Sequence, residues 1–207
     1  MSRKLFTIGH SNHDIKTYIA LLNEHQITAI ADVRSSPYCR YLSHFSKAEL
    51  KFYLREADIN YVFLGQQLGA RPQDDSCYID GKAIYEKIAA RKLFVEGIER
   101  VIKGSNKYNI ALMCAEKDPI TCHRAVLVCQ HLRNYDLDIN HIHQDSSLES
   151  HQQLEDRLLN LNGYNQPKQL NLFEQSVAVL EQTSLSKEEA LKEAYINQGL
   201  KIAYVDE

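Results

Sequence analysis

The sequence lacks the signatures of several common protein classes. No uninterrupted apolar stretch approaches the roughly 18 residues that a membrane-spanning helix needs, and the first residues lack the apolar segment of a secretory signal peptide. No GxxxxGKS, GxxxxGKT or GxGxxG sequence follows a strand-like run, which argues against ordinary P-loop and dinucleotide-binding folds. No internal repeat is present. We therefore expect a cytoplasmic protein with no membrane contact.

The cysteines lack the pairing typical of disulfide scaffolds and structural zinc sites. There are five, an odd number, in a chain of 207 residues that is long enough to bury a core without staples. Cys114 and Cys122 are eight positions apart and no second close pair exists, which argues against a structural zinc site. Neither cysteine is followed by an arginine at the spacing of a rhodanese or tyrosine-phosphatase loop, which argues against that kind of anion-binding loop. We expect free thiols, no metal and no cofactor, with a metal held by Cys114, Cys122, His123 and His10 as an open alternative.

Charge is unevenly distributed along the chain. The net charge is -3, but residues 1 to 144 hold 19 Lys and Arg against 16 Asp and Glu, whereas residues 145 to 207 hold 5 against 11. Eight of the nine histidines also precede residue 145. A mildly basic, histidine-rich body with an acidic tail is compatible with a polyanionic ligand.

The first two thirds of the chain alternate between short apolar runs and longer amphipathic segments. This pattern predicts an α/β fold with a mostly parallel sheet and helices on both faces. The predicted strands are Leu5 to Ile8, Thr28 to Val33, Tyr61 to Leu64, Asn109 to Met113 and Ile139 to Ile142. We assign the α/β domain to residues 1–162 and a C-terminal appendage to residues 163–207, which contains a linker, an acidic helix from Ser186 to Gln198 and a short strand from Lys201 to Val205.

Two helix starts bear on the candidate site. Ser11 with Asp14 fits a capping box in which each side chain satisfies a free amide. Asp118 before Pro119 supplies a cap and a residue suited to the first helical position. The second signal predicts a helix that runs continuously from Pro119.

Polar residues gather at the carboxyl ends of the predicted strands, where ligands bind in parallel α/β sheets. We expect them to form one crevice. They include His10, Ser11, Asp32, Arg34, Cys114 and Glu116. Arg34, Arg40 and Arg124 are candidates for holding an anion, because a guanidinium presents a planar fork of donors. Alternatively, Arg34 pairs with Asp32 or Glu116 and braces the loops.

Cys122 is the candidate nucleophile. On a helix from Pro119 it would share a buried stripe with Cys129 and lie at the positive helix end near Arg124, conditions that favour a thiolate. Alternatively it is a small core residue. His123 would point about 100° away around such a helix, so His10 is the better candidate for its base.

Four separated motifs resemble one family. They are TIGHS at Thr7 to Ser11, DVRSSPYCRYLSHF at Asp32 to Phe45, LGQQLGARP at Leu64 to Pro72 and MCAEKDPITCHR at Met113 to Arg124. Together they are similar to domain of unknown function 488, over about residues 4 to 145. The resemblance implies an α/β domain but no reaction. Its motif positions are His10, Ser11, Asp32, Arg34, Arg40, Cys114, Glu116, Cys122, His123 and Arg124.

A separate short motif, QLNLF, follows the linker. It resembles the peptide with which bacterial DNA polymerases and repair proteins bind the sliding clamp. The anchors would be Gln169, Leu170, Leu172 and Phe173. Alternatively, its apolar side chains dock back on the body.

These features lead to a first hypothesis of an enzyme that acts on a phosphate-bearing substrate, a nucleotide or nucleic acid, in bacterial DNA maintenance and repair. Cys122 would be the nucleophile, and His10, Asp32 or Glu116 would transfer protons. The anion would be held by Ser11, Arg34, Arg40, His123 and Arg124. The alternatives are a non-catalytic DNA-binding adaptor tethered to the sliding clamp, and a thiol redox sensor that uses Cys114 and Cys122.

Overall fold

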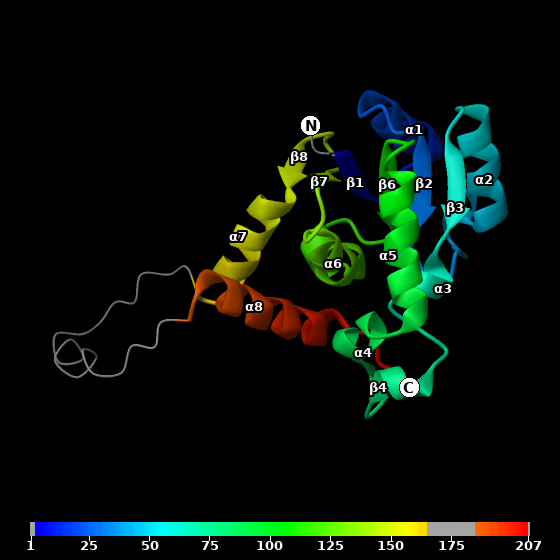
Figure 1. Ribbon diagram of the computed structural model, residues 1–207. Coiled ribbons are helices and arrows are strands. Elements are labelled where there is room, and N and C mark those ends of the chain that lie inside the picture. Colours follow the sequence, from blue (N-terminus) through cyan, green and yellow to red (C-terminus); the bar gives the residue numbers. More distant parts are fainter. Residues whose placement is uncertain (1–2, 165–184, 207) are drawn as a thin grey trace, which may run out of the picture.

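A mostly parallel sheet organises the chain, as the sequence predicts. The computed structural model describes residues 3–164 and 185–206, and within them the main sheet has six strands in the order β3-β2-β6-β1-β7-β8 (Figure 1). Only β8 is antiparallel to its neighbour. The strands are β1 Arg3–Gly9, β2 Ala29–Asp32, β3 Asn60–Phe63, β6 Ile110–Cys114, β7 Leu137–Ile142 and β8 Leu148–Ser150. A separate hairpin joins β4 Tyr78–Ile79 to β5 Lys82–Ala83.

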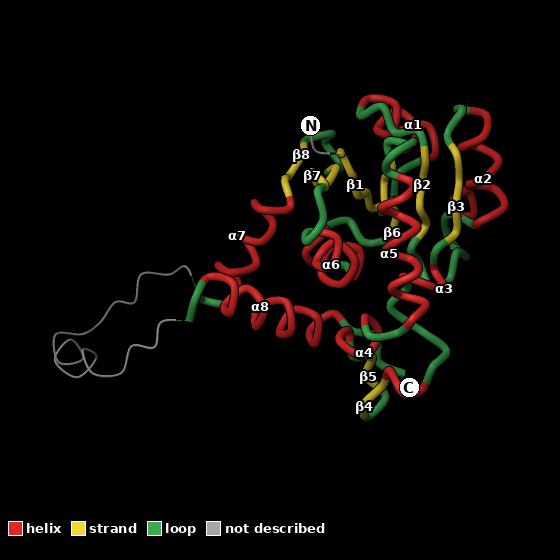
Figure 2. Tube along the Cα trace, in the orientation of Figure 1, coloured by secondary structure: helices red, strands yellow, loops and turns green. Residues whose placement is uncertain are grey.

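The predicted helices on both faces of the sheet are confirmed. They are α1 Ile15–Glu24, α2 Lys47–Glu56, α3 Gly65–Leu68, α4 Tyr85–Ala89, α5 Lys92–Gly104, α6 Gln130–Leu132, α7 His151–Leu161 and α8 Lys187–Ile202 (Figure 2). Adjacent residues of β1 enter different cores: Leu5 packs in the cluster that contains α5 and α8, and Phe6 in the cluster that contains α1 and α2. Among the described residues, no helix combines the length and apolarity needed to cross a bilayer.

The burial of each strand agrees with its position in the sheet. Every residue of β6 is buried, and β6 lies between β1 and β2 near the middle of the sheet. In contrast, β3 alternates exposed and half-buried residues at one edge. The continuous apolar run Ile110–Cys114 is typical of a parallel strand covered on both faces. The central position of β6 brings its carboxyl end between the ends of β1 and β2.

The C-terminal helix packs on the body. The helix predicted over Ser186 to Gln198 is present as α8, Lys187–Ile202 (Figure 1). Ser186 is its N-cap and forms a capping box with Glu189, and Tyr195 is buried in the core that includes α5. The predicted strand Lys201 to Val205 is wrong. Lys201 lies in the last turn of α8, and Val205 forms a single antiparallel bridge to Lys82. QLNLF, Gln169 to Phe173, lies outside the described residues, and the division at residue 162 stays a prediction.

A chain of buried hydrogen bonds connects α8 to the sheet. Tyr195 Oη contacts His151 Nε2 at 3.0 Å, His151 Nδ1 contacts His141 Nε2 at 3.1 Å, and His141 Nδ1 contacts Thr7 Oγ1 at 2.8 Å. Tyr195 Oη also donates to Glu155 at 3.0 Å. Burial, followed by the charge of Arg133, lowers the pKa of His151 to about 3. Burial also holds the pKa of His141 well below its usual value.

This buried chain predicts a loss of stability in mild acid. The folded-state pKa of His151 lies below the unfolded value of 6.5, so between those values the unfolded chain binds a proton that the folded chain does not. The free energy of unfolding should therefore decrease as the pH falls from about 7 to 5, by up to about 1.4 kcal/mol per pH unit for this histidine. In urea denaturation at several pH values, His151→Gln should show a shallower dependence. An unchanged slope would contradict the prediction.

Candidate functional site

The carboxyl ends of β1, β2 and β6 converge on one pocket, as expected for a parallel α/β sheet. The backbone after β1 runs beside the loop after β6, because the amides of His10 and Ser11 donate to the carbonyls of Cys114 and Ala115 at 2.9 Å. A Cβ on Gly9 would overlap the Glu116 carbonyl, so only glycine allows this close approach. The pocket encloses about 380 Å³ and its lining includes His10, Arg34, Ser35, Ser36, Tyr38, Arg71, Tyr85, Cys114, Glu116, Thr121, His123 and Tyr204.

The backbone around Cys122 differs from the predicted continuous helix. Asp118 and Pro119 do start a turn, with Asp118 accepting from the Ile120 amide, but it is a 3₁₀ turn that ends at Thr121. Cys122 is extended, with φ -132° and ψ 138°. Its carbonyl accepts the amides of the next helical segment, which is π-helical over Arg124–Cys129. The predicted helix from Pro119 is therefore wrong, because the amide of Cys122 closes the short turn on Pro119 instead of continuing it.

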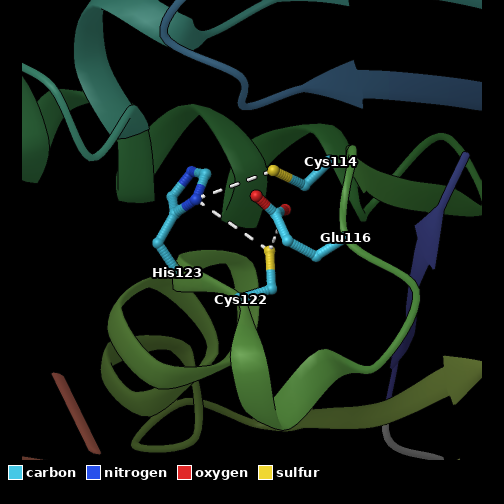
Figure 3. A group of neighbouring side chains, drawn as sticks. All are labelled: Cys114, Glu116, Cys122 and His123. Atoms are coloured by element: carbon cyan, nitrogen blue, oxygen red, sulfur yellow. Dashed lines mark hydrogen bonds between the residues drawn. The ribbon is translucent and has the colours of Figure 1, made fainter. Parts of the chain in front are cut away.

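The extended backbone brings His123 to the same side as Cys122. Nδ1 of His123 lies 3.9 Å from Cys122 Sγ and 3.6 Å from Cys114 Sγ (Figure 3). The expectation that His123 points away from Cys122 is wrong, since it assumed helical geometry between the two residues. His123 Nε2 lies 3.0 Å from the Val33 carbonyl, which can only accept, so Nε2 carries a proton and Nδ1 faces the sulfurs.

The two cysteines have opposite electrostatic environments. Burial raises the pKa of Cys114 well above the usual thiol value, and hydrogen bonding and charge at Cys122 raise it further. Burial alone would also raise the pKa of Cys122, but a hydrogen bond with Cys114 and the positive charges of Arg124 and His123 lower it well below the usual value. The pKa of His123 is raised despite burial, chiefly by Cys122. Of the two sulfurs, Cys122 is therefore the one that the surroundings favour as a thiolate.

Arg124 lies inside the protein. Its side chain is fully buried and donates to the Glu116 carbonyl at 2.7 Å, the Lys117 carbonyl at 3.2 Å and Thr7 Oγ1 at 3.3 Å. Its backbone amide donates to Cys122 Sγ at 3.4 Å. The guanidinium thus holds the loop after β6 against β1 and places a positive charge beneath the cysteines.

Arg34 pairs with Asp32, the alternative that the sequence left open. Its Nε and Nη2 donate to the two carboxylate oxygens at 2.9 and 2.7 Å, and Tyr61 Oη donates to the same carboxylate at 2.8 Å. Asp32 is fully buried, so its contacts brace the loop. Nη1 of Arg34 lies 3.3 Å from His10 Nε2, and burial, reinforced by the Arg34 charge, lowers the pKa of His10 to about 4.

The remaining predicted residues are more peripheral. Ser11 accepts from Gln144 at 2.8 Å and has a left-handed backbone with φ 46°, while helix α1 begins at Ile15 and is capped by Asp14 instead. Arg40 is exposed, and its guanidinium lies 5.7 Å from the Tyr41 ring centre.

Sequence reasoning missed several pocket residues, among them Arg71, Tyr85 and Tyr204. The guanidinium of Arg71 lies 4.2 Å from the Tyr204 ring centre, although the two residues are far apart in sequence. The motif LGQQLGARP contains Arg71 and could have identified it. The two tyrosines gave no comparable signal, because they reach the pocket through the packing of α4 and the segment after α8.

The fold and site define an α/β protein with a cysteine–histidine cluster at the carboxyl end of its sheet. Residues 14–130, more than half of the chain, match the family described as Domain of unknown function DUF488. The chain belongs to this family, which confirms the resemblance noted from its motifs. No curated protein and no solved structure matches the chain.

The role of Arg124 predicts a specific stability loss. Arg124→Lys keeps the charge, but an ammonium cannot reach all three acceptors from one position, so at least one of the buried Thr7 hydroxyl and the part-buried Glu116 and Lys117 carbonyls loses its donor. We expect the free energy of unfolding in urea to decrease by about 2–3 kcal/mol. The same substitution at Arg100, which is exposed on α5, should change it by less than about 0.5 kcal/mol. Equal effects of the two substitutions would contradict the bracing role.

Proposed function

We propose that this protein is an enzyme that acts on a nucleotide or nucleic acid in the pocket at the carboxyl end of the sheet. The observation that carries the proposal is the composition of the pocket, which combines arginines, tyrosine rings and the Cys114, Glu116 and His123 side chains. Its volume of about 380 Å³ is within the range of small-molecule sites. We further propose a cytoplasmic role in DNA maintenance.

Arg71 is the leading candidate for binding phosphate. It is exposed, lines the pocket and stacks on Tyr204, and among the described residues no ion pair to an acidic side chain involves it. Arg34 also lines the pocket, but its charge is balanced by Asp32 at 2.7 Å. A guanidinium that lies over an aromatic ring can still direct N–H groups at a phosphate oxygen.

Exposed tyrosines favour a substrate that carries bases. Tyr38 is 72% exposed and lines the pocket, and Tyr41 is 88% exposed on the same loop after β2. Arg40 lies beside the Tyr41 ring. Exposed aromatic rings next to cations are typical of surfaces that stack bases and track a phosphate backbone. In this proposal the loop after β2 extends the binding surface beyond the pocket, along a single-stranded nucleic acid.

The cysteine–histidine cluster is the proposed reactive centre. Cys114, Glu116 and His123 line the pocket, and Cys122 lies behind them in contact with Glu116. Glu116 is exposed, so among the proposed proton-transfer groups it is better placed to meet a substrate than Asp32, which is fully buried. We retain Cys122 as the thiol that acts on the substrate or supports the group that does.

Binding of a short fluorescein-labelled single-stranded oligonucleotide tests the pocket. The affinity, measured by fluorescence anisotropy, should fall as salt increases, because phosphate contacts release counterions. Arg71→Ala should weaken binding roughly tenfold, the loss expected for one charge-assisted hydrogen bond, and should make the salt dependence shallower.

Arg100→Ala, on the exposed face of α5, serves as the matched control and should leave the affinity unchanged. The same pair of variants can be compared with mononucleotides as competitors. Equal affinities of Arg71→Ala and wild type for both probes would remove Arg71 and this pocket from the proposal. Products that appear with wild type but not with Cys122→Ser would support an enzyme over a binding adaptor.

The sliding clamp remains a proposed partner on the basis of sequence alone. Gln169 to Phe173 lies outside the described residues, so the proposal rests on the resemblance of QLNLF to clamp-binding peptides. Leu172→Ala combined with Phe173→Ala should abolish co-purification with a bacterial sliding clamp, because both apolar anchors are removed. The control is Leu185→Ala, a change at an exposed leucine after the motif, which should keep the association. If the double variant still binds the clamp, QLNLF is not the clamp-binding segment, and if the wild type does not bind it, this partner is excluded.

A further inference from the structure

Four potential metal ligands converge at the wall of the pocket. One ligand atom from each of Cys114, Glu116, Cys122 and His123 lies within 4.8 Å of all the others. Cys114 ends β6, Glu116 is in the following loop, and the other two residues precede the π-helical segment (Figure 3). Three of the four residues are buried, and the exposed one, Glu116, lines the pocket.

The separations match those around a tetrahedral metal ion. Zinc bonds of about 2.3 Å to sulfur and about 2.0–2.1 Å to nitrogen place neighbouring ligand atoms about 3.6 Å apart in a tetrahedron. The corresponding distances here are 3.6 Å from Cys114 Sγ to His123 Nδ1 and 3.9 Å from Cys122 Sγ to the same atom. Glu116 Oε2 lies 2.9 Å from Cys122 Sγ, so a small rotation of this exposed side chain would complete the set.

The surrounding hydrogen bonds orient these ligands. His123 Nε2 donates to the Val33 carbonyl at 3.0 Å, which directs the lone pair of Nδ1 towards both sulfurs. The Arg124 amide donates to Cys122 Sγ at 3.4 Å, an interaction that suits a sulfur carrying negative charge. Metal-binding histidines commonly have their second nitrogen fixed in this way.

The contact between Cys122 and Glu116 requires either a proton or a cation between the two atoms. At 2.9 Å, a thiol at Cys122 would donate to Glu116, whereas a thiolate would bring two negative atoms together unless a proton or cation lay between them. The nearby guanidinium of Arg124 donates instead to Thr7 and to the Glu116 and Lys117 carbonyls. A divalent ion would satisfy two sulfurs, an imidazole and a carboxylate at once.

We propose that Cys114 Sγ, Cys122 Sγ and His123 Nδ1 bind a divalent transition metal of the zinc class, with Glu116 as an exchangeable fourth ligand. Two thiolates with an imidazole select a borderline-soft ion over Mg²⁺ or Ca²⁺. This departs from our expectation of no metal, and it also differs from the alternative that used His10. The His10 ring instead contacts Arg34 and the Ser11 carbonyl.

The metal site goes beyond the proposed function, because metal binding can occur whether or not the pocket binds a nucleotide or nucleic acid. Glu116 is the one exposed ligand and it faces the pocket, so its displacement would open a coordination position there. Such an ion could polarise a water molecule or a phosphate oxygen. Failure of the oligonucleotide test would not affect this inference, and failure of the metal test would leave the pocket proposal standing.

Metal analysis and cobalt spectroscopy test the site directly. Full-length protein purified without chelators should contain about one equivalent of zinc by mass spectrometry. After chelation, added Co²⁺ should give the near-ultraviolet sulfur-to-cobalt band and intense visible bands of a four-coordinate ion. Three variants should lose the bound equivalent of zinc: Cys114→Ser, Cys122→Ser and His123→Ala. In each of them the sulfur-to-cobalt band should disappear or become much weaker. Glu116→Gln should retain the sulfur band with lower affinity.

Cys39→Ser is the matched control, because Cys39 is a free, half-buried thiol outside the cluster. It should keep the bound zinc and the cobalt spectrum. If the cluster variants fail to fold, thiol alkylation of the wild type replaces them. A chelator should then expose Cys114 and Cys122, identified by peptide mass spectrometry, to the reagent, and leave labelling of Cys39 unchanged.

Two results would overturn the inference, and a third would replace it with the redox-sensor alternative. In the first, the purified protein contains no metal and added Co²⁺ gives only the weak spectrum of the hydrated ion. Its rate of thiol labelling is also the same with zinc, with chelator and with neither. The other is a cobalt spectrum that Cys39→Ser loses as fully as Cys122→Ser. A Cys114–Cys122 disulfide that forms on mild oxidation in protein with no affinity for zinc would favour the redox-sensor alternative instead.

Discussion

The buried guanidinium of Arg124 is the interaction on which the candidate site depends. A buried charge needs hydrogen-bond partners, and here Nε, Nη1 and Nη2 each donate to one acceptor: Thr7, the Glu116 carbonyl and the Lys117 carbonyl. These contacts fix the loop after β6 to the end of β1. The same charge lowers the pKa of Cys122. Arg124 thus sets both the shape and the potential of the cysteine–histidine cluster.

The acidic C-terminal helix is joined to this interaction through the protein interior. Thr7, which accepts from Arg124, also contacts His141, and the contacts continue through His151 to Tyr195 of α8. Each side chain in this series hydrogen-bonds to the next one. Displacement of α8 would therefore remove Tyr195 and leave the buried His151 without that partner. The placement of α8 is therefore coupled to the support beneath the site, even though the helix lies far from Arg124 in sequence.

The sequence was sufficient for the sheet because continuous apolar runs such as Ile110–Cys114 are hard to accommodate except as buried parallel strands. The site needed information that side-chain patterns do not contain. Asp118 and Pro119 start a helical turn whether the turn stops after three residues or continues, so the extended backbone at Cys122 was not predicted. That one residue determines whether His123 faces Cys122 or points away. Likewise, Tyr204 reaches Arg71 only through the packing of the C-terminal segment.

The ion pair between Asp32 and Arg34 removes one of the arginines that the sequence suggested for anion binding. Asp32 offers both oxygens to Arg34, which neutralises a cation that the sequence suggested for phosphate binding and makes it a rigid part of the wall. Burial, reinforced by the charge of the same arginine, lowers the pKa of His10 to about 4, so this ring remains neutral at physiological pH. Arg71 then supplies the pocket's exposed positive charge in the proposed function, and the cysteine–histidine cluster lines another part of the same pocket. A bound phosphate ester would meet the two in different parts of one pocket, with its charged oxygens at Arg71 and its reacting bond free to approach the sulfur-rich wall.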